Sequence, residues 1–172
     1  MFNQEIIFSK EECDKIILIH LNESNPYYAE NEKRKDIKYI AYTINPSKEG
    51  RWVFDKLKEF FTKATGIEIT SIPEKMYLHQ YKINDGFKKH WDKNKPERVW
   101  NIGIQLNSGF IGGDFNLFFD DKITIDKKEG NTYFFKSEIF HEVTPITKGE
   151  RWSLIMFLHY DHISEKPKKT LL

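Results

Sequence analysis

The sequence predicts a mainly β domain of the α+β class, with helices in its first half and packed strands in its second half. Apolar residues recur at helical spacing up to about residue 65, whereas beyond residue 75 they form short runs that alternate with polar residues. Glycine-containing joins separate these runs, at Asp85-Gly86, Ser108-Gly109, Gly112-Gly113 and Glu129-Gly130. Many short strands with glycine-rich turns indicate two packed sheets or a barrel.

The first expected element is a helix from about Lys10 to Leu21. Ser9 followed by Glu12 is a capping box, in which each side chain satisfies a backbone N–H of the other residue, and an apolar run follows it. The segment from Asn22 to Lys35 is polar and rich in turn-forming residues, so we expect a loop there.

A strand from Ile37 to Ile44 is expected to precede a second helix, which Asn45-Pro46-Ser47 opens and Gly66 closes. Apolar side chains recur along this helix, namely Trp52, Val53, Leu57, Phe60, Phe61 and Ala64. Such a stripe is typical of a helix face that packs against a core, so we assign it no chemistry.

The second half of the chain contains five runs with the composition of short strands. They are Met76–Ile83, Val99–Leu106, Asp114–Phe118, Thr132–Phe135 and Trp152–His159. We expect a single domain over residues 1–172, with a helical and strand scaffold over residues 1–74 and a strand-rich core over residues 75–162.

Composition excludes several classes of protein. The formal net charge of +1 gives no field that would attract nucleic acid or an acidic membrane, and an aromatic content of 15% allows a sizeable core. Cys13 is the only cysteine, so the chain has no internal disulfide, which fits a reducing compartment. We see no signal peptide and no stretch of transmembrane length, and therefore expect a cytoplasmic protein.

His90, Asp92 and the distant His141 have the composition of a metal site. In an H-x-D pair on a strand both side chains point to one face, and the third ligand must come from a distant strand folded over the first. Two imidazoles and one carboxylate on one face of Fe(II) leave positions open for substrate and dioxygen. Arg151 opens an apolar run, and its burial there requires an anionic partner such as a dicarboxylate.

This ordered set resembles the Fe(II)- and 2-oxoglutarate-dependent dioxygenases, and the surrounding sequence is most similar to the prolyl 4-hydroxylase-like branch. The residues that carry the resemblance are Tyr81 to Asp92, Gly112-Gly113-Asp114-Phe115, Phe134-Phe135, His141-Glu142-Val143 and Arg151-Trp152-Ser153. The resemblance implies a double-stranded β-helix, which is a jelly-roll and cupin-like fold, with the N-terminal helices buttressing one sheet. Residues 75–162 would then be the dioxygenase core.

The resemblance also implies the cofactors. His90, Asp92 and His141 would ligate Fe(II), where 2-oxoglutarate and dioxygen react to give succinate, carbon dioxide and a hydroxylated substrate. Ascorbate is a candidate reductant.

Four further residues are implicated in binding 2-oxoglutarate. The far carboxylate of this cosubstrate would pair with Arg151, and Ser153 points the same way along its strand. Tyr81 occupies the position of a tyrosine that helps hold the cosubstrate in the prolyl hydroxylase branch. Gln105, on the neighbouring predicted strand, is a candidate for the same pocket. The collagen-type enzymes usually carry lysine where this chain has Arg151.

Each of these residues also has a purely structural interpretation. His90 and Asp92 could form a surface turn, and His141, with apolar neighbours, could be a buried core histidine. A second H-x-D sequence, His159-Tyr160-Asp161, has no later histidine far enough away to complete a site and lies beyond Arg151. We interpret it as the end of the last strand.

Other histidines and the tryptophans are interpreted mainly as packing residues. His20 and His79 are expected to be ordinary helix and strand residues. Trp91 must point away from the ligands on either side of it and should pack rather than touch substrate. Trp100 and Trp152 are candidates for a pocket wall, since a flat aromatic face suits a proline ring, although core positions are the more common place for tryptophan.

The local likeness favours hydroxylation of a prolyl residue in a peptide or protein. Hydroxylation of a free amino acid or another small molecule is the main alternative. A non-catalytic metal-binding module is less favoured because the triad and Arg151 are intact. A cupin-like hydrolase or isomerase with another divalent metal is less favoured because the sequence offers no extra ligand or base for such chemistry. We expect substrate loops at Asn22–Lys35 and Lys93–Arg98, with their charges forming a solvated surface, and we expect neither nucleic acid nor a membrane as a partner.

Overall fold

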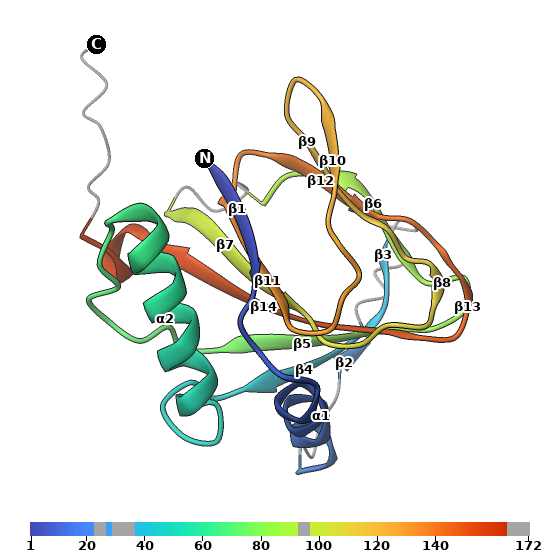
Figure 1. Ribbon diagram of the computed structural model, residues 1–172, viewed down its shortest axis with the longest axis horizontal. Coiled ribbons are helices and arrows are strands. Elements are labelled where there is room, and N and C mark those ends of the chain that lie inside the picture. Colours follow the sequence, from blue (N-terminus) through green and yellow to red (C-terminus); the bar gives the residue numbers. More distant parts are fainter. Residues whose placement is uncertain (23–26, 29–36, 93–96, 165–172) are drawn as a thin grey trace.

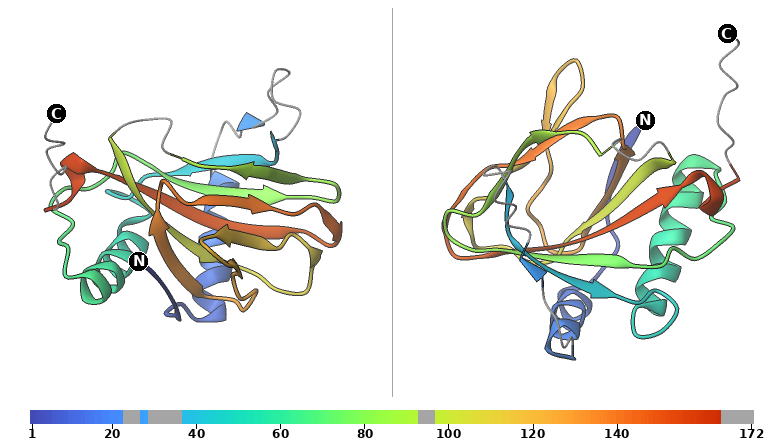
Figure 2. Two further views of the ribbon diagram at one scale, coloured as in Figure 1. Left: turned by 90° about the horizontal axis from the view of Figure 1, so that it is seen from above. Right: turned by 180° about the vertical axis from the view of Figure 1, so that it is seen from behind.

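Two antiparallel sheets enclose a common interior, and both helices lie outside it. The computed structural model describes residues 1–22, 27–28, 37–92 and 97–164. Figure 1 shows the two sheets curving around the interior, and Figure 2 shows helices α1 and α2 on the outer side of the larger sheet. The segments expected to be substrate loops, Asn22–Lys35 and Lys93–Arg98, lie largely outside the described residues.

The larger sheet contains seven strands among the described residues. In spatial order they are β1 (Phe2–Ile6), β11 (Asn131–Lys136), β7 (Arg98–Gln105), β14 (Arg151–His159), β5 (Met76–Tyr81), β4 (Ile40–Ile44) and β2 (Tyr27–Tyr28). The long strands β7, β14 and β5 form its centre, with Leu154 of β14 opposite both Ile104 of β7 and Leu78 of β5.

The smaller sheet covers the interior from the other side. Its spatial order is β10 (Lys122–Thr124), β9 (Phe115–Phe118), β12 (Phe140–Val143), β6 (Gly86–His90) and β3 (Ile37–Lys38), and β8 (Ile111–Gly112) pairs separately with β13 (Ile146–Lys148). From β5 to β14 the chain passes repeatedly between the larger and the smaller sheet. This alternation is that of a double-stranded β-helix, the predicted fold.

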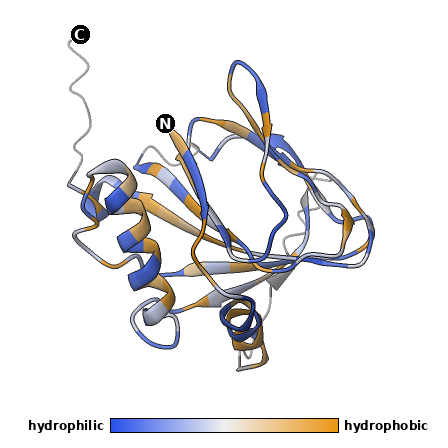
Figure 3. Ribbon diagram, viewed as in Figure 1, coloured by the Kyte–Doolittle hydropathy of each residue, from blue (hydrophilic) through white to orange (hydrophobic). Residues whose placement is uncertain are grey.

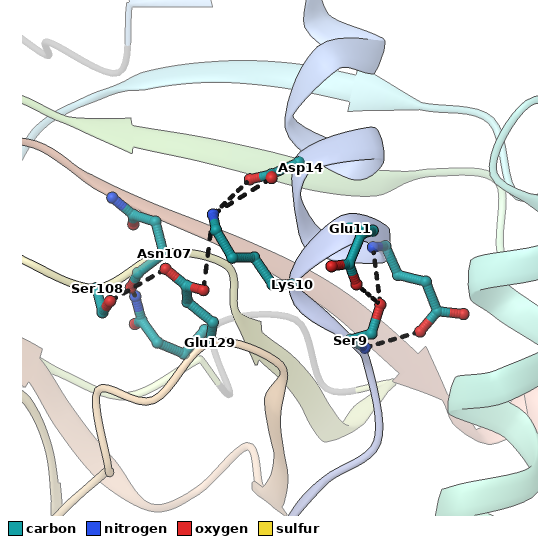
Figure 4. A network of polar contacts seen from close by, with 9 residues as sticks. Ser9, Lys10, Glu11, Asp14, Asn107, Ser108 and Glu129 are labelled. Atoms are coloured by element: carbon teal, nitrogen blue, oxygen red, sulfur yellow. Dashed lines mark hydrogen bonds and ion pairs between the residues drawn. The ribbon is translucent and has the colours of Figure 1, made fainter.

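Helix α1 (Lys10–Leu18) has the predicted capping box. The Ser9 hydroxyl accepts a hydrogen bond from the Glu12 backbone at 3.2 Å, and the Glu12 carboxylate accepts one from the Ser9 backbone at 2.8 Å. The α-helix is shorter than predicted, because residues Ile19–Asn22 continue it as a 3₁₀ turn. Figure 4 shows Lys10 near Asp14 and near Glu129. The ion pair of Lys10 with Glu129 joins the exposed start of α1 to the loop before β11.

Helix α2 (Arg51–Thr65) begins six residues later than the predicted start at Asn45. The Asn45 side chain accepts a hydrogen bond from the Ser47 backbone, and its carbonyl accepts from Lys48 and Gly50. These bonds close turns ahead of the helix. Its end is as predicted, since Gly66 adopts a left-handed conformation with φ of 71°.

Two apolar cores lie on opposite faces of the larger sheet. The first lies between this sheet and the helices and contains Val53, Leu57, Phe60 and Phe61 of α2, as predicted from their spacing. Phe54 is also buried there, whereas Ala64, the last residue of the predicted stripe, is exposed. In Figure 3 the hydrophobic stripe of α2 faces the strands and its hydrophilic side faces outward. The second core lies between the sheets and is rich in aromatic residues, including Tyr81, Phe115, Tyr133 and Phe135.

The suggestion that Trp100 and Trp152 line a pocket is wrong. Both belong to the core on the helix side, where Trp100 packs edge-on against Phe61 with the ring centroids 5.4 Å apart. The alternation of side chains along a strand explains this, because Arg151 and Ser153 face the interior and Trp152 between them must face the helices.

Several short strands were not predicted. Strand β1 is mostly exposed and polar, and only its pairing with β11 makes it a strand. Strands β6 and β12 carry two lysines and a glutamate and are only partly buried, so they lack the apolar alternation by which strands are recognised. Gly130, before β11, has φ of 79°, and a Cβ there would collide with the Phe8 carbonyl. This close approach requires glycine.

Neither α1 nor α2 has the length and apolar composition needed to cross a membrane, which holds for the described part of the chain.

Candidate active site

A cavity of about 360 Å³ lies between the two sheets. Alternate residues of β5 and β14 face it, namely Tyr77, His79 and Tyr81 of the first strand and Arg151, Ser153, Ile155 and Phe157 of the second. In the register of these strands Tyr81 pairs with Arg151 and His79 with Ser153. A cavity of this size fits a small dicarboxylate together with part of a substrate.

His90, Asp92 and His141 meet at this cavity. Each offers one ligand atom, and the three atoms lie within 4.8 Å of one another. One geometric expectation was wrong, because the third ligand does not fold over the first two. His141 of β12 lies beside His90 of β6 as its direct partner in the smaller sheet, and Asp92 follows the end of β6.

Both imidazoles have their orientation fixed by the backbone. The Nδ1 atom of His90 donates to the Lys88 carbonyl at 2.8 Å, and Nδ1 of His141 donates to the Ile139 carbonyl at 2.9 Å. Because a carbonyl can only accept, Nδ1 carries the proton in each ring. Each Nε2 atom then faces the Asp92 carboxylate, at 3.8 Å for His90 and 3.4 Å for His141. This is the tautomer that a metal ligand needs.

The Asp92 carboxylate is surrounded by donors and cations. Asn101 donates to its Oδ2 at 2.7 Å, and an Nη1 atom of Arg98 lies 3.6 Å from its Oδ1. Burial alone would raise the pKa of Asp92, but the interactions of the carboxylate with His141, His90 and Arg98 outweigh burial and lower the pKa. The carboxylate is therefore ionised.

Arg151 is buried at the inner end of the cavity, with 2% of its surface exposed. Its Nη1 donates to the Ser153 hydroxyl at 2.9 Å, and its guanidinium lies over the rings of Tyr81 and Phe115. Its Nε is buried without a hydrogen-bond partner, and no carboxylate among the described residues forms an ion pair with it. An unpaired buried cation of this kind fits an anionic ligand.

The prediction that Gln105 lines the same pocket is wrong. Its amide nitrogen donates to the backbone carbonyls of Asn107 at 2.7 Å and Trp152 at 3.3 Å, and it is not among the residues that line the cavity. Gln105 lies opposite Ser153 in the ladder, as its place in the sequence suggested. The carbonyls at the end of β7 nevertheless hold its side chain away from the interior.

Comparison with family models identifies the core of the chain. Residues 76–159 match the model of the 2OG-Fe(II) oxygenase superfamily. Residues 76–159 therefore form a 2OG-Fe(II) oxygenase core. The protein is an oxygenase whose cofactors are Fe(II), 2-oxoglutarate and dioxygen, as the sequence resemblance implied.

Solved structures of other oxygenases share the fold. A Pseudomonas putida prolyl-4-hydroxylase has a TM-score of 0.73 at 16% identity, covering 92% of this chain and 91% of its own. A Trichoplax adhaerens prolyl hydroxylase, solved with a hypoxia inducible factor peptide, has a TM-score of 0.75 at 14% identity and coverages of 92% and 83%. A viral collagen prolyl hydroxylase from Paramecium bursaria Chlorella virus 1, solved with 2OG, has a TM-score of 0.69 at 17% identity, covering 91% of this chain and 94% of its own. No curated protein matches the sequence significantly.

Several residues that contact the site of this oxygenase were missed or misread in the sequence. The sequence predicts Arg98 as part of a solvated surface, but it lines the cavity and stacks on Phe157, with its guanidinium carbon 3.6 Å from the ring centroid. Tyr133 lines the cavity, and Gly103 leaves room for its ring. His79 also lines the cavity, between Tyr39 and Tyr81. No local pattern distinguishes these residues from ordinary strand residues.

The second H-x-D sequence is the end of the last strand, as predicted. His159 is the last residue of β14, and the Asp161 side chain is 79% exposed. Among the described residues, His90, Asp92 and His141 form the only group of three such side chains close enough to share a metal ion.

Acidification is expected to destabilise the oxygenase through His79. Burial and the nearby charge of Arg151 lower the pKa of His79 to about 3. Below an unfolded-state pKa of about 6.5, the unfolded chain therefore binds one proton more than the folded chain. Each further unit of acidification then lowers the free energy of unfolding by up to about 1.4 kcal/mol. Urea unfolding should show that the free energy of unfolding falls between pH 7 and pH 5, and that this fall is about 2 kcal/mol smaller in His79→Gln than in the unaltered protein. An equal loss in both would contradict this assignment.

Proposed function

We propose that this oxygenase hydroxylates a prolyl residue of a peptide or protein, with release of succinate and carbon dioxide. The observation that carries the 2-oxoglutarate-dependent reaction is the buried Nε of Arg151, which has no hydrogen-bond partner, in the cavity that also holds His90, Asp92 and His141. A dicarboxylate with one end at Arg151 and the other at a metal would satisfy both groups at once.

In this proposal His90, Asp92 and His141 ligate Fe(II). Two neutral imidazoles and one carboxylate form the ligand set of the facial triad, which leaves other positions open. The backbone hydrogen bonds at both Nδ1 atoms support this role, because they orient the rings and raise the basicity of the ligating nitrogens.

Arg151 then binds the far carboxylate of 2-oxoglutarate. Its guanidinium presents a planar pair of donors, and Ser153 holds one of its nitrogens in place. Burial raises the pKa of Tyr81 well above its usual value, although Arg151 opposes this, so the phenol stays protonated and can donate a hydrogen bond. These three residues form the cosubstrate site that we propose.

When bound, Fe(II), 2-oxoglutarate and dioxygen supply the oxidation that replaces a substrate C–H bond with C–OH. The chain contributes positioning and a shielded interior. Phe115, Tyr133 and Phe135 are buried, line the cavity and keep water from the cosubstrate. Arg151 balances the charge of the far carboxylate, and the charges around Asp92 keep it ionised for metal binding.

The cavity also has aromatic walls that suit a prolyl residue. Tyr39, Tyr77, Phe87 and Phe157 line it, and flat aromatic faces pack well against a proline ring. Arg98 stacks on Phe157 and has a buried Nε without a partner, which suits it to the carbonyl oxygen of a peptide. The structural neighbours include prolyl hydroxylases, one of them solved with a peptide, which supports the same substrate class.

A second candidate is hydroxylation of a free amino acid or another small molecule. The same Arg98 favours it, because a guanidinium that lies 3.6 Å from an Asp92 oxygen is equally suited to a substrate carboxylate. The two candidates differ in what lies beyond the group bound by Arg98, which is more peptide chain for a peptide substrate and solvent for a free small molecule.

Incubation with Fe(II), ascorbate and 2-oxoglutarate should distinguish them. We expect proline-containing peptides to gain the mass of one oxygen and to raise succinate formation above the rate without substrate. Peptides in which alanine replaces the proline are the matched control and should give neither signal. If the proline-containing peptides give no product while a free amino acid does, the peptide assignment is wrong and the small-molecule function replaces it.

A further inference from the structure

Asp92 is the one residue of the metal cluster that no strand supports. His90 ends β6, and His141 lies within β12 as its cross-strand partner, so the sheet itself fixes both histidines. Asp92 comes two residues after β6 ends and belongs to none of the described strands. Something other than sheet pairing must therefore fix its carboxylate.

A closed ring of three hydrogen bonds provides that support. The Asp92 backbone N–H donates to the Ser137 carbonyl at 3.0 Å, and the Ser137 hydroxyl donates to Oδ1 of Asn101 at 3.0 Å. Asn101 completes the ring, because its Nδ2 donates to Oδ2 of Asp92 at 2.7 Å. The Ser137 backbone N–H is itself bound to the Val99 carbonyl at 2.9 Å, which attaches the ring to β7.

The chemistry of these groups allows only one arrangement of the ring. A carboxylate can only accept, so the amide nitrogen of Asn101 must face Asp92 and its oxygen must face Ser137. Asn101 is fully buried and Ser137 is 1% exposed, so water does not compete for these bonds. Loss of any one member would leave a buried polar group without its partner, which is costly.

We infer that Asn101 is a positioning residue for the metal ligand Asp92. Its amide keeps one oxygen of Asp92 occupied, so that the carboxylate binds Fe(II) through its other oxygen, and Ser137 holds the amide in place. This inference rests on the metal site proposed above. A carboxylate that uses one oxygen takes one metal position instead of two, which leaves more positions for 2-oxoglutarate and dioxygen. Asn101 does not line the cavity, so its effect passes through Asp92.

Metal titration of Asn101→Leu tests this role, since leucine keeps the branched shape of asparagine, with a larger volume, and removes its amide. With Mn(II) as the probe, we expect the dissociation constant to rise by roughly 10- to 100-fold, the usual effect of losing a partner of a metal ligand. The KM for 2-oxoglutarate at saturating Fe(II) should stay nearly unchanged. Ser137→Ala removes one neutral hydrogen bond and should weaken Mn(II) binding by roughly fivefold.

Asn131→Leu is the matched control. Asn131 is also a buried asparagine of the larger sheet, but its amide donates to Gln4 and to the Asp126 carbonyl, away from the cavity. This variant should bind Mn(II) as tightly as the unaltered protein. Equal weakening in Asn131→Leu and Asn101→Leu, or a matching rise in the KM for 2-oxoglutarate, would overturn the inference, because general loosening would then explain the effect.

Two further outcomes are decisive. Unchanged Mn(II) affinity in Asn101→Leu would overturn the role of Asn101, and if that variant does not fold, unchanged affinity in Ser137→Ala would do the same. Absence of Mn(II) binding in the unaltered protein would instead overturn the proposed metal site, and this inference with it. The binding measurement therefore separates failure of the inference from failure of the proposed function.

Discussion

Asp92→Ala is expected to abolish Fe(II)-dependent succinate formation while the fold stays intact. Asp92 supplies the only anionic atom of the proposed ligand set, and the two histidines that remain are neutral. Loss of a partner of a ligand costs 10- to 100-fold in metal affinity, so loss of the ligand itself should cost more than about 100-fold. Mn(II) titration and a succinate assay at saturating 2-oxoglutarate would measure the two effects, with circular dichroism as the check on folding.

Two matched variants make this result specific. Asp92→Asn keeps an acceptor for the Asn101 amide but removes the negative charge, so it should fold normally and still lose metal binding. Asp161→Ala removes the acid of the second H-x-D sequence, which is exposed and lies outside the cavity, and should keep full activity. Full succinate formation by Asp92→Ala would remove this carboxylate from the metal site.

The fold was predictable where a single segment carries enough apolar pattern. The capping box of α1 and the apolar face of α2 were recognisable from the spacing of their residues, and the long central strands were recognisable as apolar runs because they are buried on both faces. Strands such as β1 and β6 were not recognisable. They are short and polar, and pairing with distant strands makes them part of a sheet.

The candidate site shows the same division. His90, Asp92, His141 and Arg151 were found because their chemistry is unusual and their order along the chain is characteristic. Asn101 was not, because nothing in its sequence neighbourhood distinguishes it and its role depends on contacts made across the fold.

Two errors concern the direction of a side chain. Gln105 was placed on the right strand, but backbone carbonyls beyond the strand end hold its amide away from the cavity. Arg98 follows a run of charged residues that reads as a solvated surface, yet it packs on Phe157 and faces Asp92. Composition alone cannot predict either outcome, because each depends on a partner that is distant in the sequence.

Arg151→Ala is expected to raise the 2-oxoglutarate requirement strongly. Truncating one partner of a buried charge pair costs on the order of 2–5 kcal/mol, which corresponds to a rise in KM of roughly 30-fold to several thousandfold. Mn(II) affinity should change little, because Arg151 lies at the opposite end of the cosubstrate from the metal cluster in the proposed arrangement. Succinate formation as a function of 2-oxoglutarate concentration, with Mn(II) titration in parallel, would measure both quantities.

Variants of graded severity test whether Arg151 acts as a two-donor anchor. Arg151→Lys keeps the charge but loses the planar pair of donors, so its KM should lie between those of the unaltered protein and Arg151→Ala. Ser153→Ala removes the hydroxyl that holds Nη1, and should cost roughly 1 kcal/mol, or about fivefold in KM. If Arg151→Ala and Ser153→Ala both left the KM unchanged, the far carboxylate would have to bind elsewhere. The unpaired Nε of Arg151 would then require a different anionic partner, because a buried guanidinium without one is too costly to keep.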